Sequence, residues 1–307
     1  MELEIPIHGR NYAVKLIRKV AAPPEFPRLV VVSHLPNHAS IGLLETSLRA
    51  VQRFTPEPHE LWVVDNNSPE TNVERFREWP HLNLVLNRKE PLPPDVCCAD
   101  DPGSENPNQK QWGSYANGLA LELAVRLVDP RCRYFMSLHM DAVPCRTGWL
   151  PFLVSKIGPK VGAAGVRMDK TRTPEGVLHV LGYVVDFQLF KRLGLDFFPD
   201  LPQLDTGDKI TTGLRQAGYK VFACPNTVWE PELAARIPPS SPLSGIDVDR
   251  AFDDEGNVIF LHLGRGLRKT TGEHKRGFAV EEWIQVITDS LLRDADIPRS
   301  EIAYKHE

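Results

Sequence analysis

The chain has 307 residues, of which 42% are hydrophobic and 25% are charged, and its formal net charge at pH 7 is -4. This ordinary globular composition allows one large domain or two small ones around a sizeable core. The slightly acidic balance argues against a protein that binds polyanions over its whole surface. No apolar run approaches the roughly 18 residues of a membrane span, and the N-terminal segment lacks the apolar core of a secretory signal, so we expect no integral membrane segment.

The cysteine content indicates whether the protein occupies a reducing or an oxidising cellular compartment. The five cysteines include no CxxC pair, and their number is odd. This favours reduced thiols over a disulfide framework or a zinc site. We therefore expect a cytoplasmic protein.

The first half of the chain alternates strand and helix patterns. After an N-terminal hairpin within residues 4–20, short apolar runs predict buried strands, and helices are predicted between them from apolar positions at helical spacing and from Ser40 and Ser68 as N-caps. The strands are expected at 29–33, 61–64, 82–86 and 134–138, and the helices at 40–51, 69–79 and 116–127. This order predicts a mostly parallel sheet with helices on both faces.

The second half is more mixed. We expect strands at 161–166, 178–187, 219–223 and 259–262, and helices at 207–217 and 281–292. Proline clusters predict loops at 91–107 and 237–242, the second within a longer loop at 236–256.

Three polar positions follow predicted strands directly: His34, Asp65 and the segment His139-Met140-Asp141. In α/β sheets, ligands bind beyond the carboxyl ends of the strands. Asp65 could accept a hydrogen bond from a nucleobase or ribose, or it could cap the following turn. His139 and Asp141 could share one Mn²⁺ or Mg²⁺ ion that neutralises a diphosphate, with Mn²⁺ better suited to imidazole, or they could simply belong to a polar loop.

Two further segments contain charged residues at positions that suit a catalytic base or a phosphate-binding site. Asp205 and Asp208 precede a predicted helix, where a carboxylate can act as a general base or anchor an acceptor, or can cap the helix. His262 ends a strand-like run and is followed by a Gly-rich basic segment, residues 264–269 and 274–276. Such a segment suits phosphates, although a solvated loop or a nucleic-acid contact fits the same charges.

Taken in order, these segments resemble the family-two group of inverting glycosyltransferases with the GT-A fold, over residues 28 to 265. The matching stretches are VVVSHLPN at 30–37, VVDNNS at 63–68, GSYANG at 113–118, LHMDAVP at 138–144 with GWL at 148–150, and LRQAGY at 214–219 after Asp205 and Asp208. In the metal-binding DxD region of that family, this chain has His139 in place of the first Asp.

The resemblance implies a GT-A-type, Rossmann-like, mostly parallel sheet flanked by helices. It divides the chain into an N-terminal hairpin and connector (1–26), a catalytic core (27–235) and a C-terminal extension that completes the donor site (236–307). Within the core, residues 27–145 form the nucleotide-binding half and 146–235 the acceptor half.

The resemblance also assigns roles to single residues. Asp141, His262 and His139 hold a divalent metal, Mn²⁺ or alternatively Mg²⁺. Asp208, which lies nearest the family offset, or Asp205 is the catalytic base. The donor-binding residues are His34, Asn37, Asp65, Asn67, Asn117, Met140, Arg265, Arg268 and Lys269.

The implied activity is metal-dependent transfer of a sugar, with inversion, from a nucleotide-diphosphate donor to a hydroxyl acceptor. A UDP-sugar is favoured as donor, and the acceptor is a glycan, a small molecule or a modified nucleic acid. One alternative is a nucleotidyltransferase that forms nucleotide sugars, although residues 34–37 lack the Gly-rich, basic character that such an enzyme would need there. The other is a non-catalytic binding protein of the same fold, which the replacement by His139 favours.

Overall fold

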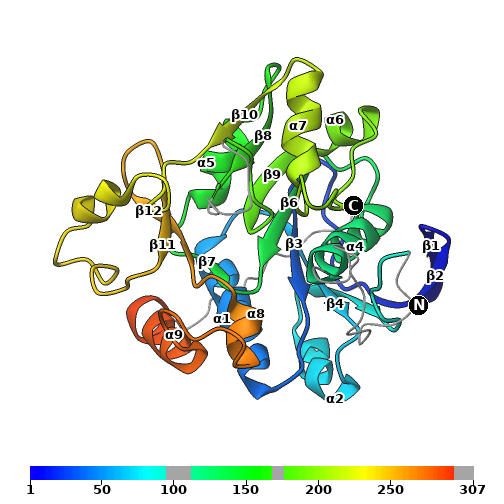
Figure 1. The fold of residues 1–307 in the computed structure, drawn as a ribbon, viewed down its shortest axis with the longest axis horizontal. Helices are drawn as coiled ribbons and strands as arrows, with labels where there is room; N and C mark the ends of the chain where they lie inside the picture. The colour runs from blue at the N-terminus through cyan, green and yellow to red at the C-terminus, as the bar shows by residue number, and fades with distance from the viewer. Residues whose placement is uncertain (95–111, 168–175, 294–307) are drawn as a thin grey trace. The chain divides into compact units, whose positions relative to one another are not determined.

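The structure, a computed structural model, describes residues 1–94, 112–167 and 176–293 (Figure 1). These residues form two compact units, each assembled from several stretches of chain. The first unit comprises Met1–Pro36, His59–His139 and Leu153–Cys224, and the second comprises Asn37–Pro58, Met140–Phe152 and Pro225–Glu307. The linear domain limits expected from the sequence stay a prediction.

The first unit contains a nine-stranded sheet in the order β1-β2-β5-β4-β3-β6-β9-β8-β10. Its strands are β1 (Glu2–Ile7), β2 (Arg10–Ile17), β3 (Arg28–Ser33), β4 (Glu60–Asn66), β5 (Leu82–Asn87), β6 (Tyr134–His139), β8 (Val161–Gly165), β9 (Gly182–Asp186) and β10 (Lys220–Ala223). The pairing directions imply that only β2 and β9 run against the other described strands of this sheet. The predicted hairpin and the mixed, mostly parallel α/β sheet are therefore confirmed.

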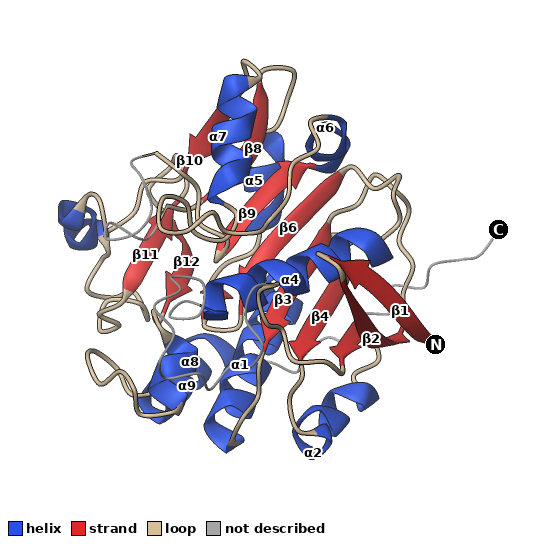
Figure 2. Cartoon of the chain, turned by 45° about the vertical axis from the view of Figure 1, so that its right-hand side comes forward, coloured by secondary structure: helices blue, strands red, loops and turns tan. Residues whose placement is uncertain are grey.

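Helices cover this sheet. The helix α4 (Trp112–Leu127) packs on β3, β4 and β5 and crosses in front of them in Figure 2. The helix α6 (Phe187–Arg192) packs on β6 and β9, and α7 (Asp208–Gln216) on β10. The central strands β4 and β5 are buried along their whole length, which explains why apolar residues predominate in both. Asn83 in β5 is a buried polar residue within such a stretch.

The order of the strands reverses at β3, which pairs in parallel with β4 on one side and β6 on the other. The register places Ser33 opposite Asp65, and Val32 opposite His139. The carboxyl ends of β3, β4 and β6 therefore meet at one edge of the sheet. Such a reversal is the usual place for a ligand in open α/β sheets.

The second unit has its own three-stranded antiparallel sheet in the order β11-β12-β7. Its elements are α1 (His38–Phe54), β7 (Ala142–Pro144), η2 (Pro231–Arg236), β11 (Asp249–Phe252), β12 (Val258–His262), α8 (Gly266–Thr270), α9 (Val280–Ile287) and the π-helical turn η3 (Thr288–Leu292). The helix α1 packs against β7, α8 and α9. The short helix α5 (Trp149–Ser155) contains the boundary between the units at Phe152.

Several predicted elements differ from the structure. The N-cap of α1 is Asn37, whose side chain accepts from the Ser40 N–H, and Ser40 returns the bond in a capping box. The helix expected at 69–79 is one turn, α2 (Glu70–Val73), with Pro69 as N-cap, followed by the 3₁₀ helix η1 (Glu74–Glu78). The strand expected at 178–187 is confined to β9, because the backbone turns between His179 and Gly182.

The C-terminal region differs as well. The loop expected at 236–256 contains the strand β11, which forms only because β12 supplies its partner. The basic loop expected at 264–269 includes the helix α8, and the helix expected at 281–292 is α9 continued by a π turn. The proline-rich loop at 91–107 lies mostly outside the described residues.

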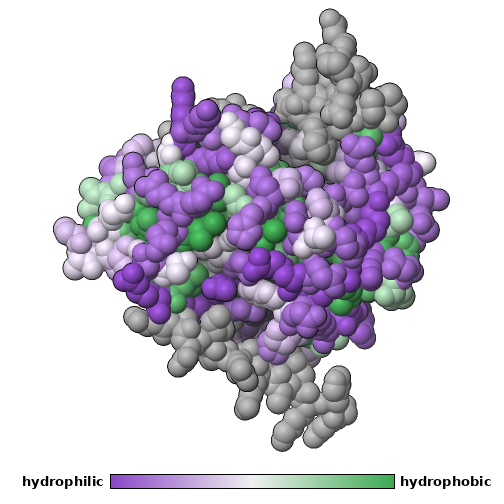
Figure 3. Space-filling view, turned by 90° about the horizontal axis from the view of Figure 1, so that it is seen from below, coloured by the Kyte–Doolittle hydropathy of each residue, from purple (hydrophilic) through white to green (hydrophobic). Residues whose placement is uncertain are grey.

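No helix in the described part of the chain is both long and apolar enough to cross a membrane. Met1 is the one large hydrophobic side chain counted as exposed among these residues, and Figure 3 shows a face on which hydrophilic side chains predominate. None of the described cysteines, Cys132, Cys145 and Cys224, forms a disulfide, and Cys97 and Cys98 lie outside the described residues.

Candidate functional site

Asp65 lies at the carboxyl end of β4 and is fully buried. Its carboxylate accepts hydrogen bonds from Ser33 Oγ at 3.2 Å, from Ser68 N at 3.0 Å and from Ser68 Oγ at 2.5 Å. Burial raises the pKa of this carboxyl, and the hydrogen bonds from Ser68 and Ser33 oppose the shift. In this structure Asp65 orders the turn after β4.

The same edge carries polar groups that are less enclosed. His34 Nδ1 lies 2.9 Å from the Asn66 carbonyl oxygen, so this nitrogen carries the proton, and the lone pair of the neutral ring is on Nε2. Asn67 is exposed in a left-handed conformation with a φ of 56°. This backbone conformation is uncommon outside glycine, and asparagine is among the residues that tolerate it. His34 and Asn67 therefore offer polar atoms to a ligand at the end of the parallel strands.

The helix α4 brings Asn117 to the end of β6. Asn117 Nδ2 lies 3.1 Å from His139 Nε2. A side chain at Gly118 would place its Cβ only 3.0 Å from the Phe197 carbonyl oxygen, so glycine is needed for this close approach of α4. His179 packs edge-on against His139 with ring centroids 5.4 Å apart. His179 was not among the residues predicted from the sequence.

Of the two candidate base residues, Asp205 lies in the tight turn before α7 and Asp208 is the first residue of α7. The Asp205 carboxylate accepts from Thr206 N at 2.7 Å, and the Thr206 hydroxyl donates to the Ser114 carbonyl at 2.6 Å. Asp208 Oδ2 accepts from Asp205 N at 2.9 Å. Asp208 is fully buried, whereas Asp205 keeps 8% of its surface exposed. Both residues are buried, and Asp205 is the less completely buried of the two.

A second set of charged groups lies within the second unit. Asp141 and His262 are buried, and Asp141 Oδ2 is 3.6 Å from His262 Nε2. The pairing of β12 with β7 places His262 opposite Ala142, the neighbour of Asp141. Two metal bonds of about 2.1 Å that meet at about 90 to 120° separate their ligand atoms by about 3.0 to 3.6 Å. The spacing and the carboxylate–imidazole donor set therefore fit a divalent cation of the Mn²⁺ type.

The other nitrogen of His262 also faces a carboxylate, because Nδ1 lies 3.4 Å from Asp249 Oδ2. Burial lowers the pKa of His262, but the charges of Asp141 and Asp249 outweigh it and raise the pKa to about 10. Without a bound cation the ring is therefore protonated at neutral pH and pairs with both carboxylates. A metal ion at Nε2 would replace that proton.

The loop between β12 and α8 closes on Asp141. Gly266 N donates to Asp141 Oδ2 at 2.8 Å, and Leu263 N donates to the Asp141 carbonyl at 3.0 Å. Arg265 adopts a left-handed conformation with a φ of 56°. Such strain is uncommon for a residue other than glycine and tends to occur where a site depends on it.

Gly266 is required here for lack of space rather than for its φ angle. A Cβ at this position would lie 2.5 Å from Asp141 Cβ and 2.8 Å from Leu43 Cδ2. We therefore expect Gly266→Ala to displace the Asp141 side chain and weaken Mn²⁺ binding by at least about tenfold. Calorimetric titration with Mn²⁺ measures this affinity, and the control is Gly245→Ala in the same unit, where an added Cβ would meet no atom within 4 Å. Unchanged affinity in Gly266→Ala would contradict the assignment of Gly266.

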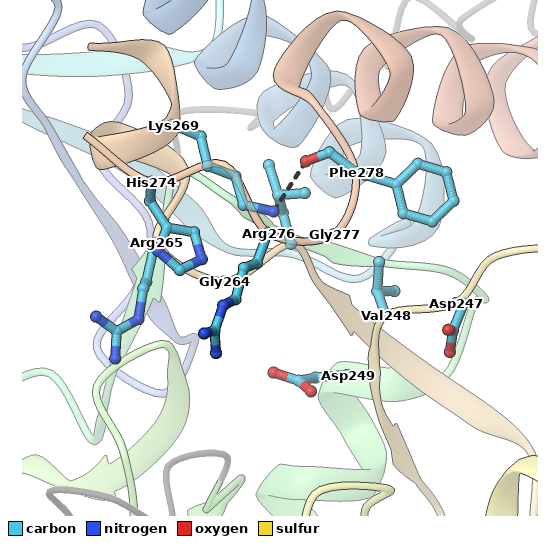
Figure 4. Close-up of a pocket in the computed structure, with 11 residues that line it drawn as sticks. Asp247, Val248, Asp249, Gly264, Arg265, Lys269, His274, Arg276, Gly277 and Phe278 are labelled. Carbon is cyan, nitrogen blue, oxygen red and sulfur yellow. Dashed lines mark hydrogen bonds between the residues drawn. The ribbon is translucent and has the colours of Figure 1, made fainter. Parts of the chain in front are cut away.

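A pocket of about 240 Å³ lies within the second unit, beside Asp249 (Figure 4). Its charged lining consists of Asp247, Asp249, Arg265, Lys269, His274 and Arg276. Partial removal from solvent lowers the pKa of His274. The positive charges around it lower this pKa further, and Arg265 has the largest effect among them. No carboxylate of the described residues forms an ion pair with Arg265 or Arg276. This concentration of positive charge suits an anionic ligand.

The other residues that were predicted to bind the nucleotide-sugar donor have varied surroundings. Lys269 Nζ donates to the Phe278 carbonyl at 2.8 Å, so it also ties the following loop to α8. Arg268 is exposed on α8 and is not part of the pocket lining. Asn37 caps α1 and donates to the Thr270 carbonyl at 2.8 Å. Met140 is buried.

The structure thus groups the predicted residues by unit. Asp141, His262, Arg265 and Lys269 lie together in the second unit, whereas the polar groups at the ends of β3, β4 and β6 belong to the first. His139 ends the second of the three stretches that form the first unit, and it precedes Asp141 by two positions. The sequence did not point to Asp249, Gly266, His274 or Arg276 as single residues of this site.

No protein-family model matches the sequence, and no curated protein matches it. Among solved structures, the chain is similar to the mannosyltransferase PcManGT from Pyrobaculum calidifontis, in complex with GDP-Man and Mn²⁺, at 20% identity and a TM-score of 0.46 over 68% of this chain and 58% of that one. It is similar to the galactosyltransferase LgtC, in complex with donor and acceptor sugar analogs, at 13% identity and a TM-score of 0.48 over 86% and 96% of the two chains.

A third solved structure is the glycosyltransferase GlyE of Streptococcus pneumoniae TIGR4, at 11% identity and a TM-score of 0.45 over 86% of this chain and 60% of that one. The chain therefore spans less than two thirds of the length of PcManGT and of GlyE. These solved structures are glycosyltransferases, the class that the sequence motifs resemble. At such identities and TM-scores they assign neither an activity nor a ligand to this chain.

Proposed function

We propose that the protein is a metal-dependent glycosyltransferase that moves a sugar from a nucleotide-diphosphate donor to a hydroxyl acceptor. The observation that carries the proposal is the Asp141–His262 pair, with its 3.6 Å spacing, beside a pocket in the same unit that is lined by Arg265 and Arg276, neither of which pairs with a carboxylate of the described residues. A diphosphate carries several negative charges, so a divalent cation together with positively charged side chains suits it well.

The proposed metal ligands are Asp141 and His262. His139, which precedes Asp141 by two residues in the sequence, is the proposed third ligand. Asp141 is held by the Gly266 N–H, which is the kind of supporting hydrogen bond that orients ligands in metal sites. The mixed carboxylate and imidazole donors favour Mn²⁺ over Mg²⁺. When bound, the ion would stabilise the charge that develops on the leaving diphosphate.

The basic pocket binds the phosphate oxygens of the leaving group directly. Arg265 and Arg276 extend from the loops around α8 and offer guanidinium groups that bind phosphate oxygens in pairs (Figure 4). Lys269 holds the loop before Phe278 in place through its backbone hydrogen bond. In this proposal the leaving group is bound by cationic side chains as well as by the ion.

For the nucleotide, we propose the edge formed by β3, β4 and β6. The Asp65 carboxylate already accepts three hydrogen bonds, so its part is to order the turn that presents Asn67. The exposed Asn67 and the Nε2 atom of His34 then contact the base or ribose, and Asn117 orients His139. A UDP-sugar is the donor that the sequence motifs favour.

The catalytic base is proposed to be Asp205. It is the more accessible of the two carboxylates before α7, and Asp208 supports it by accepting its N–H. A base in this position takes the proton of the acceptor hydroxyl as it attacks the anomeric carbon. Attack from the face opposite the leaving diphosphate gives inversion.

A thermal-shift screen tests this proposal. A ligand that binds only the folded protein raises its melting temperature, so we expect stabilisation by one nucleotide sugar when Mn²⁺ is present and little without it. UDP-, GDP- and dTDP-sugars form the panel, and the free sugars are the control. If no nucleotide sugar stabilises the protein with Mn²⁺, the proposed donor site is wrong.

A further inference from the structure

Asp249 has a fixed place next to His262. The two residues are Cα partners in the antiparallel pairing of β11 with β12. Directly opposite residues of an antiparallel pair place their side chains on the same face of the sheet. The proximity of the carboxylate to the imidazole therefore follows from the register of the sheet.

The geometry divides the two nitrogens of His262 between two carboxylates. Nε2 faces Asp141 at 3.6 Å, and Nδ1 faces Asp249 at 3.4 Å. The two nitrogens of an imidazole point away from each other, so an ion held at Nε2 is out of reach of Asp249. The side chain of Asp249 is 39% exposed, in contrast to 7% for Asp141.

We propose that Asp249 is a positioning residue that accepts the Nδ1–H of His262 and so directs the Nε2 lone pair toward the metal ion. A carboxylate behind a metal-bound histidine sets its tautomer and its ring orientation, and it makes the imidazole a stronger donor. This inference rests on the proposed function, because it requires that His262 and Asp141 bind a divalent cation. It adds a residue that neither the motifs nor the ligand spacing single out.

Asp247 provides a matched control. It lines the same pocket two positions earlier in the chain, but it is not the partner of His262. Removing its carboxylate changes the charge of the pocket by the same amount as removing that of Asp249. A difference between the two variants therefore reports the contact with His262 rather than the general electrostatic field.

The experiment is a Mn²⁺ titration of the full chain, followed by the electron paramagnetic resonance signal of the unbound ion. We expect Asp249→Ala to weaken Mn²⁺ binding about 10- to 100-fold, Asp249→Asn to weaken it less because the amide oxygen still accepts, and Asp247→Ala to leave it unchanged. In a His262→Ala background, Asp249→Ala is expected to cause no further loss. Melting temperatures confirm that each variant is folded.

Three other outcomes would contradict the role of Asp249 or the metal site. Equal affinity of Asp249→Ala and the wild-type chain overturns the positioning role while leaving the metal site in place. The same loss in Asp247→Ala, or a full further loss in the His262→Ala background, shows that Asp249 acts through its charge alone and also overturns the role. If the wild-type chain binds no Mn²⁺, the proposed metal site itself fails.

Discussion

Replacing Asp141 with asparagine is expected to lower Mn²⁺-dependent release of the nucleoside diphosphate by at least about 100-fold, because charge stabilisation of the leaving group is a large part of catalysis. Asparagine has nearly the same size and can still accept the hydrogen bond that Gly266 N donates to Asp141. The variant therefore removes the negative charge at the ion while preserving the loop. Without metal the variant also loses the buried ion pair with His262, so its melting temperature is expected to fall. Circular dichroism at the assay temperature checks that the variant is still folded.

The matched control is Asp289→Asn, the same chemical change on the partly exposed η3 turn of the same unit. It should retain full activity. Release of the nucleoside diphosphate is followed with a coupled assay at saturating donor, in Mn²⁺ and in a chelator. An Asp141→Asn variant that keeps full Mn²⁺-dependent activity would remove Asp141 from the site.

The second large effect is expected at the turn before α7. Asp205→Asn should lower kcat about 10²- to 10⁴-fold, the contribution typical of a general base, with little change in the KM for the donor. Asp208→Asn should lower kcat much less, since an amide oxygen can still accept the Asp205 N–H. The comparison requires kcat and KM for both variants, because only a loss confined to kcat identifies a group that acts in the transition state.

The reverse result would also be informative. If Asp208→Asn loses kcat and Asp205→Asn does not, the base is Asp208, as the motif spacing predicts, and the turn must rearrange to expose it. If both variants keep kcat, neither carboxylate is the base. Donor hydrolysis without acceptor shows whether each variant still binds and activates the donor, because the attacking water can lose its proton to solvent.

Much of the fold could be predicted because the central strands are buried on both faces. Such strands are mostly apolar, so β3, β4, β5 and β6 stand out in the sequence, even though buried polar residues such as Asn83 and Ser137 interrupt them. By contrast, β11 is a four-residue strand with charged residues, and it exists because of its pairing with β12. The turn between His179 and Gly182 depends on backbone hydrogen bonds that no local pattern announces.

The residues of the candidate site could likewise be predicted from the sequence only in part. Asp65, His139 and Asp141 could be found because each follows a buried run, and ligands gather at strand ends. Asp249 could not, because its significance depends on the register that brings it opposite His262. The role of Gly266 depends on the 2.5 Å that would separate its Cβ from that of Asp141. Distances of this kind become known only when the chain is folded.

The most direct test of the account is whether the wild-type chain releases a nucleoside diphosphate from a nucleotide sugar, with Mn²⁺ and with a chelator in parallel. A panel of UDP-, GDP- and dTDP-sugars is incubated with and without a mixture of simple hydroxyl acceptors. We predict release from at least one donor in Mn²⁺ and its loss in the chelator and in Asp141→Asn. Release that is equally fast in the chelator, or no release from a donor that the protein binds, would contradict a metal-dependent glycosyltransferase.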